Sequence, residues 1–159
     1  MMGFRATFYK PGATDLKMTL NDMPGHLIRR LHQISTQVFQ KYLQETEYDI
    51  TSVQYATMLV LKDNPGIEQA QVASLIAHDR ATIGGVIDRL EQKGYLIRLV
   101  SARDRRAREV SLSEEGLKVV EDVTPVVEAL QRDILANLSN TEASRLTALL
   151  QKAVGLDLS

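Results

Sequence analysis

The order of helical and strand-like patterns in the middle of the chain constrains the fold more than any other feature. Apolar residues recur there at three- and four-residue steps, the period of a buried helix face, over residues 51–64, 68–76 and 79–93. Two further segments resemble the strands of a hairpin, because apolar and polar residues alternate well in residues 107–112 and partly in residues 95–100. With 159 residues, the chain is long enough for about one domain and an appended element. The sequence therefore predicts a mainly α domain in which three helices precede a hairpin.

This order of elements is typical of a winged helix-turn-helix. The second of two docked helices can enter the major groove of DNA, which is about 12 Å wide. A basic hairpin beside that helix can reach the backbone or the minor groove. The turn of the predicted hairpin holds four arginines within six positions, Arg103, Arg105, Arg106 and Arg108. The pattern thus indicates double-stranded DNA as a partner.

The charge distribution favours the same interpretation, although the formal net charge of the chain is only -1. Residues 80–108 carry eight basic and three acidic side chains, a net charge of +5. The rest of the chain carries 11 basic and 17 acidic side chains, a net charge of -6. A basic segment in an acidic body suits a partner with concentrated negative charge. The alternative is a solvated surface on which the arginines pair with neighbouring acids.

Helical patterns on both sides of this domain predict a second, helical region. Residues 22–45 are apolar on two adjoining faces, so this helix must be covered on more than one side. Asp22 is placed to cap it, and Pro24 fits its first turn. Two more helical patterns follow the hairpin, over residues 113–137 and 139–154. Pro125 predicts a kink or a break inside the first of them. We therefore expect a loose arm over residues 1–17, a DNA-binding domain over 47–112 and a dimerisation region over 18–46 and 113–159.

Two consecutive glycines, Gly84 and Gly85, interrupt the third helical pattern. Each costs a helix about 1 kcal/mol relative to alanine, so the pair must bring a gain elsewhere. One interpretation is close approach of a phosphate backbone, and the alternative is tight packing of another helix. The pair is not part of a phosphate-loop motif, and the chain shows no nucleophile–base or paired-carboxylate arrangement. We therefore do not expect an enzyme.

The run from Asp79 to Gly116 resembles the signature of the MarR family of transcriptional regulators; it reads DRATIGGVIDRLEQKGYLIRLVSARDRRAREVSLSEEG. The shared pattern is a helix ending in D-R-L-E-x-K-G, a strand, a D-x-R turn and then L-[ST]-x-x-G. The resemblance extends from about Met18 to the end of the chain. It implies an all-helical dimer with two winged domains, in which the first and the last two helices form the dimerisation region.

The resemblance also implies which residues contact DNA. The recognition-helix positions that match the groove contacts of the family are Arg80, Ala81, Thr82, Gly85 and Arg89. The corresponding wing positions are Arg103, Asp104, Arg105 and Arg106. In the family, the arginine at the position of Arg106 enters the minor groove, and the aspartate at the position of Asp104 orients the wing arginines.

Within the family, the stretches PGHLIRRLHQIS and TSVQYATMLVL are most similar to regulators of aromatic-acid catabolism. That subgroup includes repressors that respond to 3-hydroxybenzoate or to aromatic acyl-CoA thioesters. An aromatic carboxylate needs an apolar slot with a cation or several donors, because a bare buried carboxylate is costly. Family effectors bind where the dimerisation and winged regions meet, so the candidate effector residues are Arg29, His32, Ser35 and Tyr55. Alternatively, Arg29 pairs with acids of the last helices and His32 lies in the core or an interface.

Composition excludes several other classes. The chain has no cysteine, which rules out disulfides, thiolate metal sites and thiol-based oxidant sensing. Its three histidines are scattered, so we expect no metal and no cofactor. No apolar segment approaches the ~20 residues that span a bilayer, and we expect a cytoplasmic homodimer without a membrane partner. The alternative class is a winged-helix protein that binds DNA without sequence preference or binds another protein.

Overall fold

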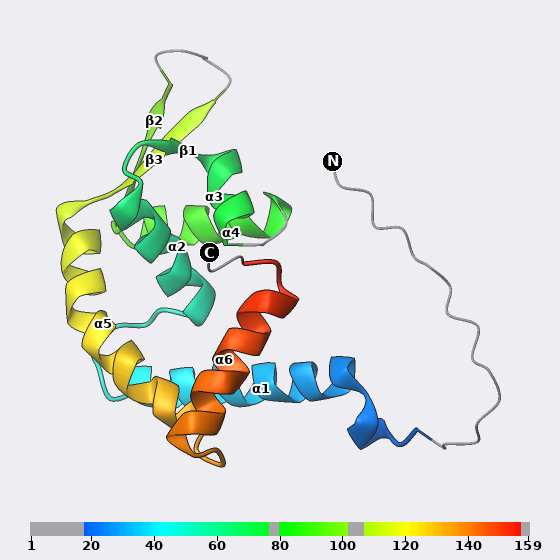
Figure 1. Cartoon of the computed structure of the whole chain (residues 1–159). Coiled ribbons are helices and arrows are strands. Elements are labelled where there is room, and N and C mark those ends of the chain that lie inside the picture. The colour runs from blue at the N-terminus through cyan, green and yellow to red at the C-terminus, as the bar shows by residue number, and fades with distance from the viewer. Residues whose placement is uncertain (1–17, 77–79, 102–106, 157–159) are drawn as a thin grey trace, which may run out of the picture.

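The computed structural model describes residues 18–76, 80–101 and 107–156 (Figure 1). Its elements in chain order are the 3-10 helix η1 (Leu20–Asp22), α1 (Pro24–Leu43), α2 (Ser52–Asp63), β1 (Ile67–Glu68), α3 (Gln69–Leu75), α4 (Arg80–Gln92), β2 (Leu96–Val100), β3 (Arg108–Leu112), α5 (Glu114–Ile134) and α6 (Asn140–Ala153). The predicted fold class is confirmed, because the chain is mainly helical and α2, α3, α4 and the β2–β3 hairpin follow one another as in a winged helix-turn-helix. The predicted wing residues Arg103, Asp104, Arg105 and Arg106 lie outside the described residues.

Local signals place most helix ends where the sequence predicts them. The Gln54 N–H donates to Thr51 Oγ1 and the Thr51 N–H donates to Gln54 Oε1, at 3.2 and 2.9 Å, which closes the predicted capping box of α2. Gly94 follows α4 with a φ of +77°, the left-handed conformation that favours glycine. The predicted Asp22 cap of α1 is wrong. Met23 is the N-cap residue, and the carboxylate of Asp22 accepts hydrogen bonds from Thr19 within η1 instead.

α5 passes through Pro125 as one helix, so the predicted break does not occur. Proline removes the N–H that would bond the carbonyl of Glu121, four residues earlier. Both residues lie on the exposed side of α5, where solvent can satisfy that carbonyl. The buried side of α5, which carries Val119, Val120 and Val123, holds the helix against the core.

The sheet has a third strand that the sequence analysis missed. Its order is β1-β3-β2, and β1 pairs antiparallel with β3 so that Ile67 lies opposite Val110. In the predicted hairpin, Leu96 pairs with Leu112 and Val100 with Arg108. β1 has only two residues, which is too short to show an alternating pattern. It joins the start of α3 to the hairpin.

The β2–β3 hairpin lies at one end of the molecule and α1 at the other, with α6 extending from the α1 end toward the middle (Figure 1). α5 runs from the base of the hairpin to the end where α1 and α6 lie, and it contacts both α2 and α1. One continuous core joins these elements, and its fully buried members include Met58 of α2, Ile87 and Leu90 of α4, Val110 of β3 and Val120 of α5.

The outer helices leave apolar surface uncovered. No residue of α6, every residue of which is described, is buried, and its Leu149 is 55% exposed. On α1, Leu27 and Ile28 are 46% and 59% exposed. The prediction that α1 is covered on more than one side therefore requires a surface that a single chain does not supply. The division into a dimerisation region and a DNA-binding domain stays a prediction.

Candidate nucleic-acid interface and effector cleft

One face of α4 is buried and the other faces away from the core. Ile83, Ile87 and Leu90 are fully buried beneath the helix. Thr82, Gly85 and Arg89, at three- and four-residue steps, are exposed on the opposite face. Arg80 and Ala81 belong to the first turn of α4, but their side chains lie outside the described part of the chain. The described members of the predicted recognition set therefore share one outward surface.

The glycine pair of α4 is not explained by packing within the described residues. A Cβ added to Gly85 would have no described atom within 4 Å, and one added to Gly84 would lie at an ordinary 3.6 Å from Gln69 Nε2. Tight helix packing therefore does not require either glycine. The interpretation that remains from the sequence is close approach of a partner to the exposed backbone at Gly85.

A charged network joins α4 to the wing. Arg98, on β2, lies with Nη2 at 2.6 Å from Asp88 Oδ1 and at 3.0 Å from Glu91 Oε2, both on α4. The Arg98 side chain is only 20% exposed, so these ion pairs are partly shielded from solvent. They confirm that some charges of the basic segment are salt-bridged, as the alternative interpretation held. They also fix the base of the wing against the recognition helix.

A cleft of about 310 Å³ separates α1 from α4, and we refer to it as the α1–α4 cleft. It is lined by His32, Thr36, Phe39 and Gln40 of α1, by Thr51, Ser52 and Val53 at the start of α2, and by Thr82, Val86 and Arg89 of α4. The lining combines an aromatic ring and two valines with hydroxyls, an imidazole and a guanidinium. The cleft thus brings one predicted effector residue, His32, together with two predicted DNA-contacting residues, Thr82 and Arg89.

The other predicted effector residues do not line the α1–α4 cleft. Ser35 lies with His32 in a larger, mostly apolar cleft of about 580 Å³ between α1, α5 and α6, which we call the α1–α6 cleft. Arg29 is exposed, with its Nη2 atom 3.4 Å from Nδ1 of His26. Tyr55 is buried against Phe39, and its hydroxyl lies 2.9 Å from Thr124 Oγ1.

Sequence reasoning missed several residues of the α1–α4 cleft. Thr36, Phe39 and Gln40 follow His32 at steps of four, seven and eight residues, so they continue its helical stripe and could have been included. Thr51 and Ser52 line the cleft because α2 begins there, and no pattern in the sequence signals this.

The described residues include neither a cluster of metal ligands nor a helix that could span a membrane. Within residues 18–76, 80–101 and 107–156, no group of three histidine, aspartate or glutamate side chains is placed to hold a metal ion. Among the helices of those ranges, none combines the length and apolar character that a membrane span requires.

The element order, the exposed face of α4 and the adjoining basic hairpin define a winged helix-turn-helix protein. The sequence pattern of the MarR family matches residues 48–107. The transcriptional regulator HosA of Escherichia coli O157:H7 is 33% identical over 135 residues, which cover 85% of this chain and 97% of HosA. The chain belongs to the MarR family of transcriptional regulators.

Solved structures of two other regulators are similar along most of the chain. One is Bordetella bronchiseptica BpsR, whose DNA binding is regulated by 6-hydroxynicotinic acid; it has a TM-score of 0.79 and 28% identity, with 87% of this chain and 98% of BpsR covered. The other is the PcaV transcriptional regulator of Streptomyces coelicolor in complex with its natural ligand, with a TM-score of 0.77, 29% identity, and 91% and 97% of the two chains covered.

Proposed function

We propose that this chain is a homodimeric repressor that binds a pseudo-palindromic operator and releases it when a small aromatic acid, such as a hydroxybenzoate, enters the α1–α4 cleft. One observation carries the proposal. The cleft is lined both by His32 of α1 and by Thr82 and Arg89 of the recognition helix. An effector bound there touches the helix that reads DNA.

The lining matches the chemistry of an aromatic acid. Phe39, Val53 and Val86 supply an apolar slot for a ring. Arg89 offers a guanidinium for the carboxylate, which a planar, bidentate donor recognises well. Thr36, Thr51 and Ser52 offer hydroxyls for ring substituents. Of the four predicted effector residues, His32 is the one that this site uses directly.

The size of the cleft favours a free acid over an acyl-CoA thioester. At about 310 Å³, the cleft lies at the lower end of the usual ~300–1,000 Å³ of ligand pockets. A single ring with a carboxylate fits that volume, whereas most of a CoA thioester would lie outside it. The response of BpsR to 6-hydroxynicotinic acid, another small aromatic acid, supports the same class of effector.

Uncovered apolar surface supports the homodimer. Leu27 and Ile28 of α1 and Leu149 of α6 are each more than two-fifths exposed, and the α1–α6 cleft beside them is mostly apolar. A second copy that covers this surface places the two recognition helices on half-sites ~34–36 Å apart. Arg80, Ala81, Thr82, Gly85 and Arg89 would contact the major groove, and Arg103, Asp104, Arg105 and Arg106 the backbone and minor groove.

Repression and its release follow from competition between two states. The effector favours a conformation in which Arg89 pairs with its carboxylate and α4 is displaced from its position for DNA. Operator binding favours the other conformation, so each ligand weakens the other by the same factor. Blocking a promoter until the acid appears is the regulatory logic that this coupling supports.

The test measures operator binding by fluorescence anisotropy, on a duplex that the wild-type protein selects from a random library. We expect 3-hydroxybenzoate, 4-hydroxybenzoate or 6-hydroxynicotinate to raise the operator Kd, and benzoyl-CoA to act more weakly. The His32→Ala variant is expected to need about tenfold more acid for the same release, since it removes a cleft contact.

His26→Ala is the matched control, because His26 lies on α1 outside the α1–α4 cleft. Equal responses of the two variants would contradict the cleft as the effector site. If no acid changes operator affinity, the aromatic-acid effector is wrong. A preference for the selected duplex well below ~10³ over unrelated DNA would favour the architectural alternative.

A further inference from the structure

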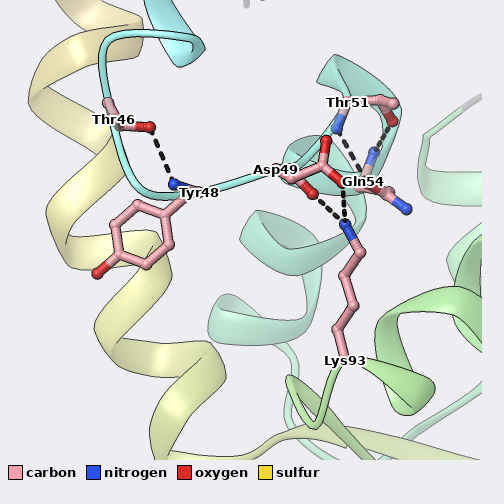
Figure 2. Close-up of polar contacts among 6 residues, drawn as sticks. All are labelled: Thr46, Tyr48, Asp49, Thr51, Gln54 and Lys93. Carbon is pink, nitrogen blue, oxygen red and sulfur yellow. Dashed lines mark hydrogen bonds and ion pairs between the residues drawn. The ribbon is translucent and has the colours of Figure 1, made fainter.

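The loop between α1 and α2, residues 44–51, makes polar contacts within itself and with the helices at both of its ends. Thr46 Oγ1 donates to the carbonyl of Leu43 at 2.8 Å and accepts the N–H of Tyr48 at 3.2 Å. At its other end the loop closes on the capping box of Thr51 and Gln54 (Figure 2). The loop is therefore a defined connection between α1 and the winged domain.

Consecutive residues of this loop reach two different elements. The Tyr48 hydroxyl donates to Asp122 of α5, and this hydrogen bond raises the pKa of Tyr48 above its ordinary value. Lys93, the residue directly after α4, donates from Nζ to the backbone carbonyl of Asp49 and lies 3.2 Å from Asp49 Oδ2 (Figure 2). The loop thus fastens the end of the recognition helix to the frame made by α1 and α5.

α4 and the wing behave as one unit at this contact, because Arg98 of β2 pairs with both Asp88 and Glu91 of α4. Lys93 follows that helix and carries the contact to the loop; its side chain is 30% exposed, and the side chain of its partner Asp49 is fully exposed. The Lys93–Asp49 contact therefore links the recognition helix and the wing, through the loop, to α1.

We infer that Lys93 is a positioning residue, which through Asp49 fixes the orientation of the recognition helix and wing and so sets the half-site spacing that the dimer accepts. The inference rests on the proposed dimeric operator binding. Inserting one base pair between half-sites moves one of them by ~3.4 Å and rotates it by roughly 36° about the DNA axis. A rigidly oriented pair of recognition helices meets only one spacing, whereas a loosened pair adapts.

The experiment compares three duplexes: the operator selected by the wild-type protein, and the same operator with one central base pair inserted or deleted. We expect the wild type to bind the two altered duplexes about tenfold more weakly, a loss comparable to that of a mismatched base pair. For Lys93→Met we expect a few-fold loss on the selected operator and a spacing penalty of about threefold or less.

Three further variants separate positioning from simple loss of charge. Lys93→Arg keeps a donor for Asp49 and should restore most of the wild-type spacing penalty. Asp49→Asn removes the carboxylate but keeps the backbone carbonyl as an acceptor, so its spacing penalty should lie between those of the wild type and Lys93→Met. It removes a negative charge, whereas Lys93→Met removes a positive one. Lys62→Met, at the exposed end of α2, loses the same charge as Lys93→Met and should keep the full penalty.

Two results would overturn this inference but leave the proposed function standing. One is a wild type that is sensitive to spacing together with a Lys93→Met variant that is equally sensitive. The other is a uniform loss on all three duplexes with a salt slope lowered by about 0.9, which would make Lys93 a phosphate contact. A wild type indifferent to spacing overturns the proposed dimeric function as well. Urea unfolding checks that Lys93→Met folds, and Asp49→Asn carries the test if it does not.

Discussion

Replacing Gly116 with alanine should destabilise the protein because the new methyl group has no room. Gly116 is the third residue of α5, where the helix begins against Tyr95, the residue before β2. Its Cβ would lie 2.1 Å from the carbonyl oxygen of Tyr95, 3.0 Å from the carbonyl carbon and 3.3 Å from Leu112 Cδ2. Two of these three atoms are backbone, so rotation of a side chain cannot relieve the clash.

The size of the expected loss of stability depends on how far the first turn of α5 must move. Restoring van der Waals contact requires the first turn of α5 to shift by about 1 Å, and such overpacking costs about 1–3 kcal/mol. The shift also strains the 3.0 Å hydrogen bond that the Ser113 N–H donates to the Tyr95 carbonyl, a bond worth about 1 kcal/mol. Alanine returns up to about 1 kcal/mol of helix propensity. We expect a net loss of about 2 kcal/mol, or roughly 4–8 °C in Tm for a chain of this size.

Gly85→Ala is the matched control, because the same change on α4 meets no described atom within 4 Å. It should raise the free energy of unfolding by up to about 1 kcal/mol through helix propensity alone. Both variants are unfolded in urea at one protein concentration, since the stability of a dimer depends on concentration. A Gly116→Ala variant as stable as the wild type, or a change of the same sign in both variants, would refute the reasoning.

Three other predictions concern DNA binding and pH. Gly85→Ala should weaken operator binding at least about fivefold while the fold becomes more stable, and unchanged operator affinity would show that the bare backbone at Gly85 is not a DNA contact. Arg106→Ala should weaken operator binding and lower the salt slope by about 0.9, and an unchanged Kd would remove Arg106 from the wing contacts. Hydrogen bonds from the hydroxyl and the N–H of Ser139 lower the pKa of Glu142, so its stabilising contribution is present above its ordinary pKa and is lost as pH falls through the lowered value. Glu142→Gln should therefore lose less stability than the wild type in urea unfolding between about pH 6 and pH 3, and an equal loss would contradict that role.

Features that depend on a few neighbouring residues could be predicted from the sequence. The Thr51–Gln54 capping box and the left-handed Gly94 fix the ends of α2 and α4 through contacts within four residues. The element order then follows, because hydrophobic period distinguishes helix from strand in long segments. Asp22 failed for a local reason too: its carboxylate accepts the N–H and the hydroxyl of Thr19, three residues earlier, and Met23 is left as the N-cap of α1.

Features that depend on how helices meet could not be predicted in the same way. The spacing of Arg29, His32 and Ser35 shows that they lie near one another on α1, but not which part of that surface turns toward α4 and which toward α6. His32 lines both the α1–α4 cleft and the α1–α6 cleft. Ser35 lines the α1–α6 cleft but not the α1–α4 cleft, and Arg29 lines neither of them. Tyr55 illustrates the same limit, since a helical tyrosine beside apolar residues suits a ligand slot and the core equally well.

The placement of Arg89 changes how the charge of the chain bears on its regulation. In the sequence, Arg89 counts toward the +5 segment that suits DNA, while the predicted effector residues lie on α1 and α2. In the structure, Arg89 lines the cleft beside His32. A guanidinium that neutralises an effector carboxylate no longer neutralises a phosphate, so an anionic effector there withdraws positive charge from the DNA-binding surface. Because each lost phosphate contact also removes about 0.9 from the salt slope, the effector should weaken operator binding and make it less dependent on salt. A neutral analogue of the same shape offers Arg89 no carboxylate, so it should displace α4 less and leave both the operator Kd and the salt slope closer to those of the free protein.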